Sequence, residues 1–469
     1  MPLTSSVPVA FASRRIMWTL RALCVTLLAL HLAAPHLPEA QAWAVWPYTY
    51  LPPIWRWLLA ALAGATLLPA VANRLADAIT TRPGLPTRHR NALFAFIALL
   101  CLLPFSLWRI VHTRWGDAYI LVNGISYPDP ALRVGVSWRA PIDLWLHIRL
   151  WEFGQRLWGW TDAWPAYRIL SPLAGVLFVF VLLKLADSIG HTRSEKLLIA
   201  GLIGTLGLMQ IFFGYAENYS LAAAGVLLFL WLALETLAGR RALWQPALAL
   251  AVTHGLHPST LVLAPALLYV LMVDARRTSW PRALLQAALP MFIVGGGIWL
   301  LMTASGHGLG TLATTDSPGG GDGRWLVPLR HTATRWEHYT LFSAAHLLDW
   351  LNSHLLSAPV TLGSLLILAA AAWRQRIPAA VSDAEIRFLF VATAGYWLFT
   401  WIWNPDYGGQ RDWDLFSLAA LPGTLLLARA LPRFLRARAT LNQAAVMLIA
   451  VSAIHTIAWI YQNTRPWEW

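Results

Sequence analysis

The connector NPDYGGQRDWDLFS (404–417) lies between two strongly apolar runs, FLFVATAGYWLFTWIW (388–403) and LAALPGTLLLARAL (418–431). Similar runs recur along most of the 469 residues, of which 58% are hydrophobic and only 12% are charged. Soluble domains carry about 25% charged residues, whereas an apolar helix of about 20 residues crosses a hydrocarbon core of about 30 Å. The sequence therefore predicts an all-α polytopic membrane protein, with residues 1–469 forming a single membrane-embedded unit.

About thirteen transmembrane helices are expected, and an odd number places the two termini on opposite sides of the membrane. The first run has the basic start and apolar centre of a signal peptide, but its long core and the lack of a small-residue cleavage site favour a retained helix. The expected spans are 14–34, 54–73, 91–110, 168–188, 197–214, 220–238, 244–256, 259–274, 283–303, 356–373, 388–403, 414–430 and 443–461.

Basic residues, which give a net charge of +13, fall in alternate connectors. The connectors 35–53, 214–219 and 255–258 contain no Lys or Arg. Because basic loops stay in the cytoplasm, we expect a cytoplasmic amino terminus and an extracytoplasmic carboxyl terminus. The excess of Arg over Lys is typical of a GC-rich bacterial genome, so the expected location is the bacterial inner (plasma) membrane, in contact with membrane lipid. Nucleic acid is a poor partner, because no basic soluble domain is present.

Two long connectors, 111–167 and 304–355, are predicted on the extracytoplasmic side of the membrane. The first contains PIDLWLHIRLWEFGQRLWGW (141–160), which has the pattern of an amphipathic interfacial helix. The second returns to helical spacing near its end, where His346, Asp349 and Asn352 share one helix face. This polar face is either solvated or lines a cavity.

Ionisable residues gather on the same predicted face. Asp117, in RWGDAYILVNGISYP (114–128), either ends a helix or offers a carboxylate that takes a proton from a hydroxyl or binds a metal. In GYAENYS (214–220), Glu217, Asn218 and Tyr219 form either a solvated turn or a polar and aromatic rim for a sugar.

HGLHPS (254–259) joins two segments that are too short to span comfortably. Broken helices of this kind are tolerated where they line a cavity, so His254 and His257 are expected either to bond to neighbours or to face a wet pocket.

Within the connector 404–417, Asn-Pro and Gly-Gly predict a sharp turn before the next helix. Asp412 falls at the N-cap position and Asp414 in the first turn, where capping is worth about 1 kcal/mol. Arg411 is a cation beside a helix N-terminus, which is unfavourable unless an anion binds there. We expect Asp412 or Asp414 to orient this guanidinium through a bidentate pair.

The sequence has no HExxH, GxSxG, CxxC or Walker motif and no internal repeat. The acidic WGD sequence just outside an early span, the interfacial helix in the same loop, the uneven spans and the second large loop resemble the GT-C superfamily. In layout the chain is similar to protein O-mannosyltransferases and lipid A aminoarabinose transferases. In those families the acidic loop usually follows the first span, whereas here three expected spans precede it. WGDAY also has one carboxylate, where a pair is common.

The resemblance implies a GT-C-like fold and a glycosyltransferase that moves a sugar from a polyprenyl-phosphate carrier to a lipid, glycan or protein acceptor at the extracytoplasmic face. Asp117 would be the general base, no cofactor is implied, and a divalent metal stays possible. The residues expected to face the donor phosphate are Arg411, His254, His257, Arg330 and Arg335, and those expected to line the substrate are Glu217, Asn218, Tyr219, His346, Asp349, Asp412 and Asp414.

Two other functions also fit a cationic outer face. One is a transporter or flippase for an anionic lipid-linked molecule, and the other is a non-catalytic scaffold for envelope assembly. The short, plainly basic cytoplasmic loops argue against alternating access, because a transporter also needs polar groups in its cytoplasmic half.

Overall fold

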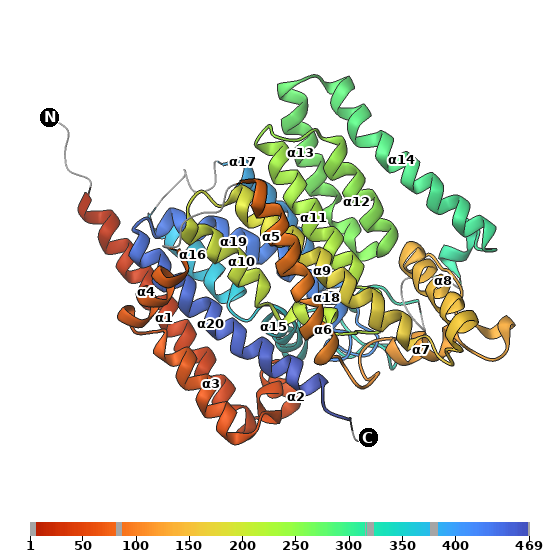
Figure 1. The fold of residues 1–469 in the computed structure, drawn as a ribbon, viewed down its shortest axis with the longest axis horizontal. Coiled ribbons are helices and arrows are strands. Elements are labelled where there is room, and N and C mark those ends of the chain that lie inside the picture. The colour runs from red at the N-terminus through yellow and green to blue at the C-terminus, as the bar shows by residue number, and fades with distance from the viewer. Residues whose placement is uncertain (1–5, 81–86, 315, 317–322, 376–382, 468–469) are drawn as a thin grey trace.

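The computed structural model describes residues 6–80, 87–314, 316, 323–375 and 383–467, and in these residues the chain is a bundle of α-helices (Figure 1). An isolated bridge between Leu326 and Trp403 is the only β pairing in the described chain, so the all-α class is confirmed. The helices are α1 (Ser6–Ala33), α2 (Glu39–Ala42), α3 (Pro53–Ala65), α4 (Pro69–Thr80), α5 (Thr87–Leu100), α6 (Leu102–Leu107), α7 (Ala118–Ile125), α8 (Pro141–Trp158), α9 (Trp164–Ile189), α10 (Arg193–Gly204), α11 (Ser220–Leu237), α12 (Trp244–Leu256), α13 (Ala264–Arg277), α14 (Trp280–Ala304), α15 (Ala344–Ser357), α16 (Thr361–Gln375), α17 (Ala384–Ile402), α18 (Trp413–Ser417), α19 (Ala420–Phe434) and α20 (Arg438–Asn463).

Short 3-10 turns connect several of these helices. They are η1 (Ala34–His36), η2 (Trp46–Tyr50), η3 (Pro130–Leu132), η4 (Gly207–Phe212), η5 (Pro258–Leu263) and η6 (Leu309–Ala313).

Local sequence explains where several helices begin and end. Thr192 caps α10 by accepting from the N–H of Glu195, and a Glu195 carboxylate oxygen accepts from the N–H of His191, just before the cap. The helix predicted within 141–160 is α8, which ends at Gly159 with a φ of 67°, a conformation that favours glycine. Its place at a membrane interface remains a prediction.

Thirteen spans are not confirmed. In the described residues, 8 helices are long and apolar enough to cross a membrane, or up to 10 if each of two bent pairs counts as one span. The bent pairs are α3 with α4 and α15 with α16. The expected spans 197–214, 244–256 and 388–403 correspond to α10 with η4, to α12 and to α17, which are not among the candidate spans. The coarser prediction of a multi-pass membrane protein is confirmed.

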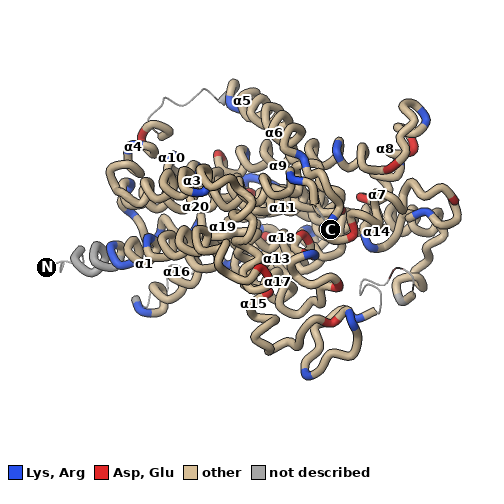
Figure 2. The backbone as a smooth tube through the Cα atoms, turned by 90° about the horizontal axis from the view of Figure 1, so that it is seen from below, with Lys and Arg blue, Asp and Glu red and all other residues tan. Residues whose placement is uncertain are grey.

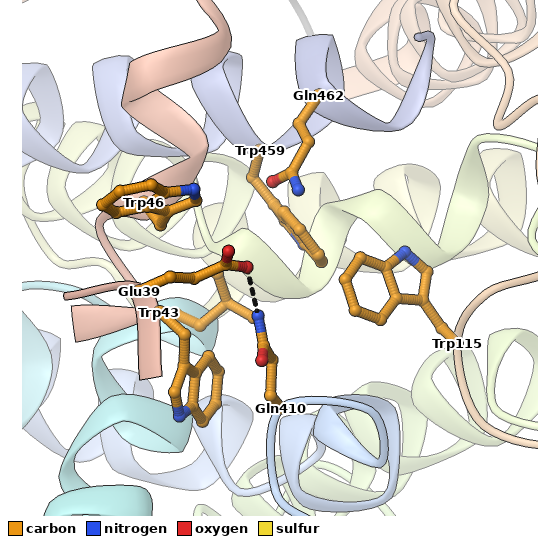
Figure 3. Close-up of a pocket in the computed structure, with 8 residues that line it drawn as sticks. Glu39, Trp43, Trp46, Trp115, Gln410, Trp459 and Gln462 are labelled. Atoms are coloured by element: carbon orange, nitrogen blue, oxygen red, sulfur yellow. Dashed lines mark hydrogen bonds between the residues drawn. The ribbon is translucent and has the colours of Figure 1, made fainter. Parts of the chain in front are cut away.

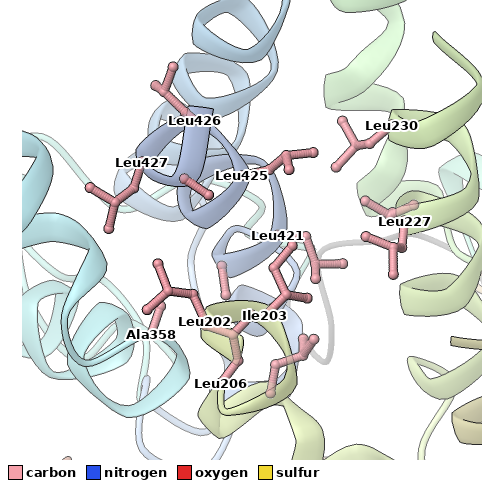
Figure 4. Close-up of a cluster of buried hydrophobic side chains, with 14 of the residues drawn as sticks. Leu202, Ile203, Leu206, Leu227, Leu230, Ala358, Leu421, Leu425, Leu426 and Leu427 are labelled. Atoms are coloured by element: carbon pink, nitrogen blue, oxygen red, sulfur yellow. The ribbon is translucent and has the colours of Figure 1, made fainter. Parts of the chain in front are cut away.

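The core is formed by α9, α10, α11, α19 and α20, whose apolar side chains pack together at the centre of the bundle. Figure 4 shows one part of this core, where Leu202 and Ile203 of α10 lie close to Leu421 and Leu425 of α19. By contrast, only 11% of the most apolar window of α14 is buried, as expected for a helix that faces lipid.

Ion pairs join the basic connectors at one end of the bundle. The buried guanidinium of Arg429 lies 3.3 Å from a Glu195 oxygen and 2.7 Å from a Glu385 oxygen. Further hydrogen bonds and ion pairs link Arg90 and Lys196 to Asp187, Arg193 and Arg438 to Thr80, and Arg433 to Asp383. These contacts bring together connectors that the charge pattern predicts on one side. Figure 2 shows long uncharged stretches of helix between the charged ends.

The first and last helices start and finish at opposite ends of the bundle. In both whole-molecule views α1 begins at the end away from the finish of α20 (Figures 1 and 2). This arrangement fits the predicted placement of the termini, although which end faces the cytoplasm remains a prediction.

Candidate active site

Four connectors that are distant in sequence meet at the end of the bundle away from the basic ion pairs. The N–H of Gly116 donates to the carbonyl of Arg411 (2.9 Å), which ties the segment after α6 to the loop before α18. The N–H of Gly409 donates to an Asp349 carboxylate oxygen (2.9 Å), which ties the same loop to α15. The N–H of Asp117 donates to Glu217, in the turn before α11.

Asp117 lies at the centre of this meeting point and is only half-buried. The hydroxyl of Tyr407 donates to Asp117 Oδ1 (3.0 Å). Burial, and next the Asp117 charge, raise the pKa of Tyr407 above its ordinary value, so the phenol stays a donor at neutral pH. The carboxylate is thus oriented by Tyr407 while it keeps access to the surroundings.

Asp412 and Asp414 join the same cluster through different hydrogen bonds. Asp412 occupies the N-cap position of α18 without capping it, because its Oδ2 accepts from the N–H of Tyr407 (2.8 Å). Asp414 Oδ1 accepts from the N–H of Leu415 (2.9 Å), in the first turn, and its Oδ2 accepts from the hydroxyl of Tyr215 (3.0 Å). Asp412 therefore does not cap α18, and of the two acids only Asp414 accepts from a backbone N–H at the start of this helix.

Burial and neighbouring negative charges raise the pKa of two acids that surround Asp117. Glu217 is 5% exposed, and burial, followed by Asp414 and Asp117, raises its pKa well above the ordinary value. Burial and then Asp414 raise the pKa of Asp412 in the same way. Neutral Glu217 and Asp412 would limit the repulsion within the cluster and leave Asp117 as its accessible carboxylate.

Gly116 makes this close approach of acids sterically feasible. Its φ is +49°, and a Cβ atom at this position would lie 2.4 Å from Glu217 Oε1 and 3.1 Å from Asp414 Oδ2. Both acids therefore pack directly against the glycine backbone, which no other residue could allow without displacing a carboxylate.

Arg411 is exposed and makes no bidentate pair with Asp412 or Asp414 in the described residues, so that prediction is wrong. Its guanidinium lies 4.9 Å from the centroid of the Tyr407 ring instead. Arg114, two residues before Gly116, stacks on Trp467, with its guanidinium 3.3 Å from the ring centroid. Burial lowers the pKa of Arg114, an effect that Glu39 partly offsets and to which the charge of Arg411 adds.

The Asp349 carboxylate joins three separate segments of the chain through hydrogen bonds. Its carboxylate accepts from the indole N–H of Trp43 (2.9 Å), the hydroxyl of Tyr339 (2.9 Å) and the N–H of Gly409. Three donors satisfy this carboxylate, so Asp349 positions the loop before α18.

His254 and His257 bond to their neighbours. His254 Nδ1 lies 2.9 Å from Thr260 Oγ1, and His257 Nδ1 lies 2.8 Å from Ser259 Oγ. The His257 ring contacts Tyr219, with the ring centroids 4.5 Å apart. His257 therefore approaches the turn that carries Glu217. Both imidazoles bond to neighbouring hydroxyl groups, which was one of the two interpretations of the sequence.

The remaining predicted residues lie at the margin of the cluster. Arg335 stacks on Trp336 (4.6 Å), whose ring contacts that of Tyr407 (6.0 Å). His346 packs between Tyr339 and Trp401. Arg330 is exposed and Asn218 is buried, with Asn218 Oδ1 3.5 Å from the Tyr167 hydroxyl. No ion pair joins Arg330 or Arg335 to the carboxylates in the described part of the chain.

Sequence reasoning missed Tyr407 and the buried acid Asp143. Tyr407 and Tyr215 both bond to the cluster, but only Tyr215, in GYAENYS, was expected at a polar and aromatic rim. Asp143 of α8 is 1% exposed and lies 3.0 Å from His147, whose ring stacks on Tyr167 at 3.9 Å. The spacing of Asp143 and His147, four residues apart on one helix, was the available signal.

A small cavity, with room for about one water molecule, lies beside the cluster (Figure 3). We call it the tryptophan cavity, because Trp43, Trp46, Trp115 and Trp459 line it. Glu39, Gln410, Gln462 and Leu356 complete the lining, and Gln410 Nε2 donates to Glu39 Oε1 (3.0 Å). No group of three or more His, Cys, Asp or Glu side chains among the described residues could hold a metal ion.

No protein-family model matches this sequence, and no curated protein matches it. Among solved structures, the chain is similar to ArnT from Cupriavidus metallidurans bound to undecaprenyl phosphate, with a TM-score of 0.50 and 13% identity over 80% of this chain and 77% of that chain. The apo state of the same protein matches with a TM-score of 0.48 and 12% identity, over 80% and 76% of the two chains. The described chain therefore shares the fold of the aminoarabinose transferase ArnT, and its resemblance to GT-C enzymes is confirmed at the level of the fold.

Proposed function

We propose that the protein is a glycosyltransferase that moves a sugar from a polyprenyl-phosphate carrier to an acceptor hydroxyl at the extracytoplasmic face. The observation that carries the proposal is the junction of Asp117, Tyr407 and Arg411, where an accessible carboxylate and an exposed cation stand on either side of one tyrosine. Glycosyl transfer from a lipid phosphate needs both groups, a base for the incoming hydroxyl and a cation for the leaving phosphate.

In the proposed reaction the acceptor oxygen attacks the anomeric carbon while Asp117 takes the hydroxyl proton. The bond between the anomeric carbon and the phosphate oxygen breaks, and the lipid phosphate leaves with that electron pair. Arg411, with Arg114 beside it, stabilises the growing negative charge on the phosphate. Tyr407 holds Asp117 in position, and the neutral forms of Glu217 and Asp412 keep neighbouring charge low.

The fold shared with ArnT supports the lipid carrier, because that protein was solved with undecaprenyl phosphate bound. We therefore expect undecaprenyl phosphate, carrying one sugar, to be a suitable donor here as well. His257 and Arg335 lie at the edge of the cluster and would contact the donor only if their loops move closer to it.

The decisive experiment is turnover of radiolabelled lipid-linked sugar in proteoliposomes that contain the full chain. The enzyme hypothesis expects label to reach an acceptor, and Asp117→Asn should lower the rate at least about a hundredfold, as for loss of a general base. Label that crosses the membrane without a new bond would instead identify a transporter. Near-normal transfer by a well-inserted Asp117→Asn protein would remove Asp117 from the role of base.

The face of the membrane is tested separately by cysteine labelling. In a background in which Cys24 and Cys101 are replaced by alanine, single cysteines at Tyr127 and Arg436 report on the two ends of the bundle, because both side chains are exposed. An impermeant reagent should label position 127 from outside intact cells and position 436 only after permeabilisation. The reverse pattern would place the cluster on the cytoplasmic face.

A further inference from the structure

The segment 110–117 lies between α6 and α7 and carries the proposed base, Asp117. It forms no helix or strand of its own, so its hydrogen bonds to other segments decide where its side chains lie. The end of α20 accepts two of these bonds. The Asn463 carbonyl accepts from the N–H of Val111 (3.1 Å), and Asn463 Oδ1 accepts from the indole N–H of Trp115 (2.6 Å). Because Asn463 and Trp115 are both buried, α20 fixes the loop that carries the proposed base.

Trp467, in the segment that follows α20, extends this contact to a charged side chain. The Arg114 guanidinium carbon lies 3.3 Å from the centroid of the Trp467 ring and 5.0 Å from that of the Trp115 ring. The Trp467 ring also contacts the rings of Tyr50 and His112, with centroids 6.4 Å and 6.0 Å apart. A cation over an aromatic face is attracted by the negative charge of that face. Neighbouring rings thus hold Trp467 in place, and Trp467 in turn holds Arg114.

The ring contact restrains the Arg114 guanidinium without using its hydrogen-bond donors. The N–H groups point outward in the guanidinium plane, whereas Trp467 contacts the central carbon. In the described part of the chain, the Arg114 side chain donates no hydrogen bond and joins no ion pair. Glu39, whose charge partly offsets the effect of burial on the pKa of Arg114, accepts a hydrogen bond from Gln410 instead. A half-buried guanidinium with free donors suits an anion that accepts two parallel bonds, as a phosphate does.

Arg114 and Arg411 are held by different rings. The N–H of Gly116 donates to the carbonyl of Arg411 (2.9 Å), so the two backbone segments that carry these cations are aligned. The Arg411 guanidinium, however, lies 4.9 Å from the centroid of the Tyr407 ring. Loss of the Trp467 ring would therefore release one of the two cations and leave the other in place.

We propose that Trp467 is a positioning residue of the enzyme, which holds the Arg114 guanidinium in the orientation that receives the phosphate of the lipid-linked donor. This inference rests on the proposed function. It adds that the segment after α20 contributes to donor affinity through Arg114, although the Trp467 side chain itself carries no charge.

The test is a double-mutant cycle on the affinity of the full chain for undecaprenyl phosphate, measured in phosphatidylcholine nanodiscs. Arg114→Ala should raise the dissociation constant at least about tenfold, as for the loss of charge-assisted hydrogen bonds. Trp467→Ala should raise it about fivefold, within the range for a cation over an aromatic ring. In the Arg114→Ala background, Trp467→Ala should change the constant less than about twofold, because the effects of residues in direct contact are not additive.

Two further variants and a second probe separate positioning from folding. Trp467→Phe keeps an aromatic face, so it should bind undecaprenyl phosphate within about twofold of wild type. Trp57→Ala, at a tryptophan that is 66% exposed on α3, is the matched control and should bind as wild type. Undecaprenol, which has the same chain without the phosphate, should bind to wild type and to every variant alike.

Additive effects of Trp467→Ala and Arg114→Ala would overturn the inference, because the ring would then act without the guanidinium. Unchanged affinity in either single alanine variant would also overturn it, while the lipid carrier would stand. If Trp467→Phe lost as much affinity as Trp467→Ala, the aromatic face would not be the cause and the inference would fail. A wild-type protein that does not bind undecaprenyl phosphate would instead reject the proposed function, so the two failures are distinguishable.

Discussion

Replacing Tyr407 with phenylalanine isolates the contribution of one hydroxyl to the proposed base. The variant keeps the ring under Arg411 and beside Trp336, and its N–H still bonds to Asp412, but Asp117 Oδ1 loses a donor at 3.0 Å. A hydrogen bond to a charged group is worth about 1.5 to 3 kcal/mol. This corresponds to a rate loss of about 10- to 100-fold, because each 1.36 kcal/mol of barrier is tenfold. Since Tyr407 and Asp117 are both half-buried, we expect about tenfold.

The assay is the initial rate of sugar transfer in proteoliposomes, with kcat and KM determined separately. Loss of a positioning hydroxyl should lower kcat with little effect on the donor KM, since the phosphate contacts are retained. Tyr127→Phe, in an exposed part of the first long loop, is the control and should behave as wild type. A Tyr407→Phe rate within about twofold of wild type, alongside an inactive Asp117→Asn, would refute the idea that this hydroxyl positions the base.

Three further predictions follow from the cluster. Arg411→Ala should weaken the binding of undecaprenyl phosphate at least about tenfold. Arg411→Lys should weaken it less, because lysine keeps the charge but loses the planar fork. An alanine variant that binds undecaprenyl phosphate as tightly as wild type in a titration would exclude Arg411 as a phosphate ligand. The pKa of Glu217 in the folded state is raised above its ordinary 4.5. Its contribution to stability is therefore present below pH 4.5 and is lost as pH rises through the raised value. Glu217→Gln should remove this loss, so a plot of the melting temperature against pH should be flatter for the variant than for wild type. Gly116→Ala should abolish transfer by displacing Glu217. Gly159 has a similar positive φ but open space around it, so Gly159→Ala should lower stability alone. Similar losses of activity in both variants would show that backbone strain is the cause.

The sequence by itself was sufficient to identify the class of protein. Helix formation and membrane affinity depend on local composition, so α1, α9 and α20 can be recognised from their own residues. The alternating basic connectors likewise predicted which segments meet at one end, and the contacts of Arg429 with Glu195 and Glu385 agree with that grouping. Asp117 was singled out as an acid just after the third expected span, and its role is a proposal.

The tertiary structure decided where the apolar helices break and which polar side chains meet. Apolar composition alone did not show that α10 and α12 end after 12 and 13 residues, too short to be candidate spans. The cavity joins Trp115 to Gln410 and Trp459, which have no common local pattern. The Asp412 carboxylate accepts from the N–H of Tyr407 and not from the first turn of α18, and only the folded loop determines this contact. Such choices depend on distances between segments hundreds of residues apart, which composition and spacing do not contain.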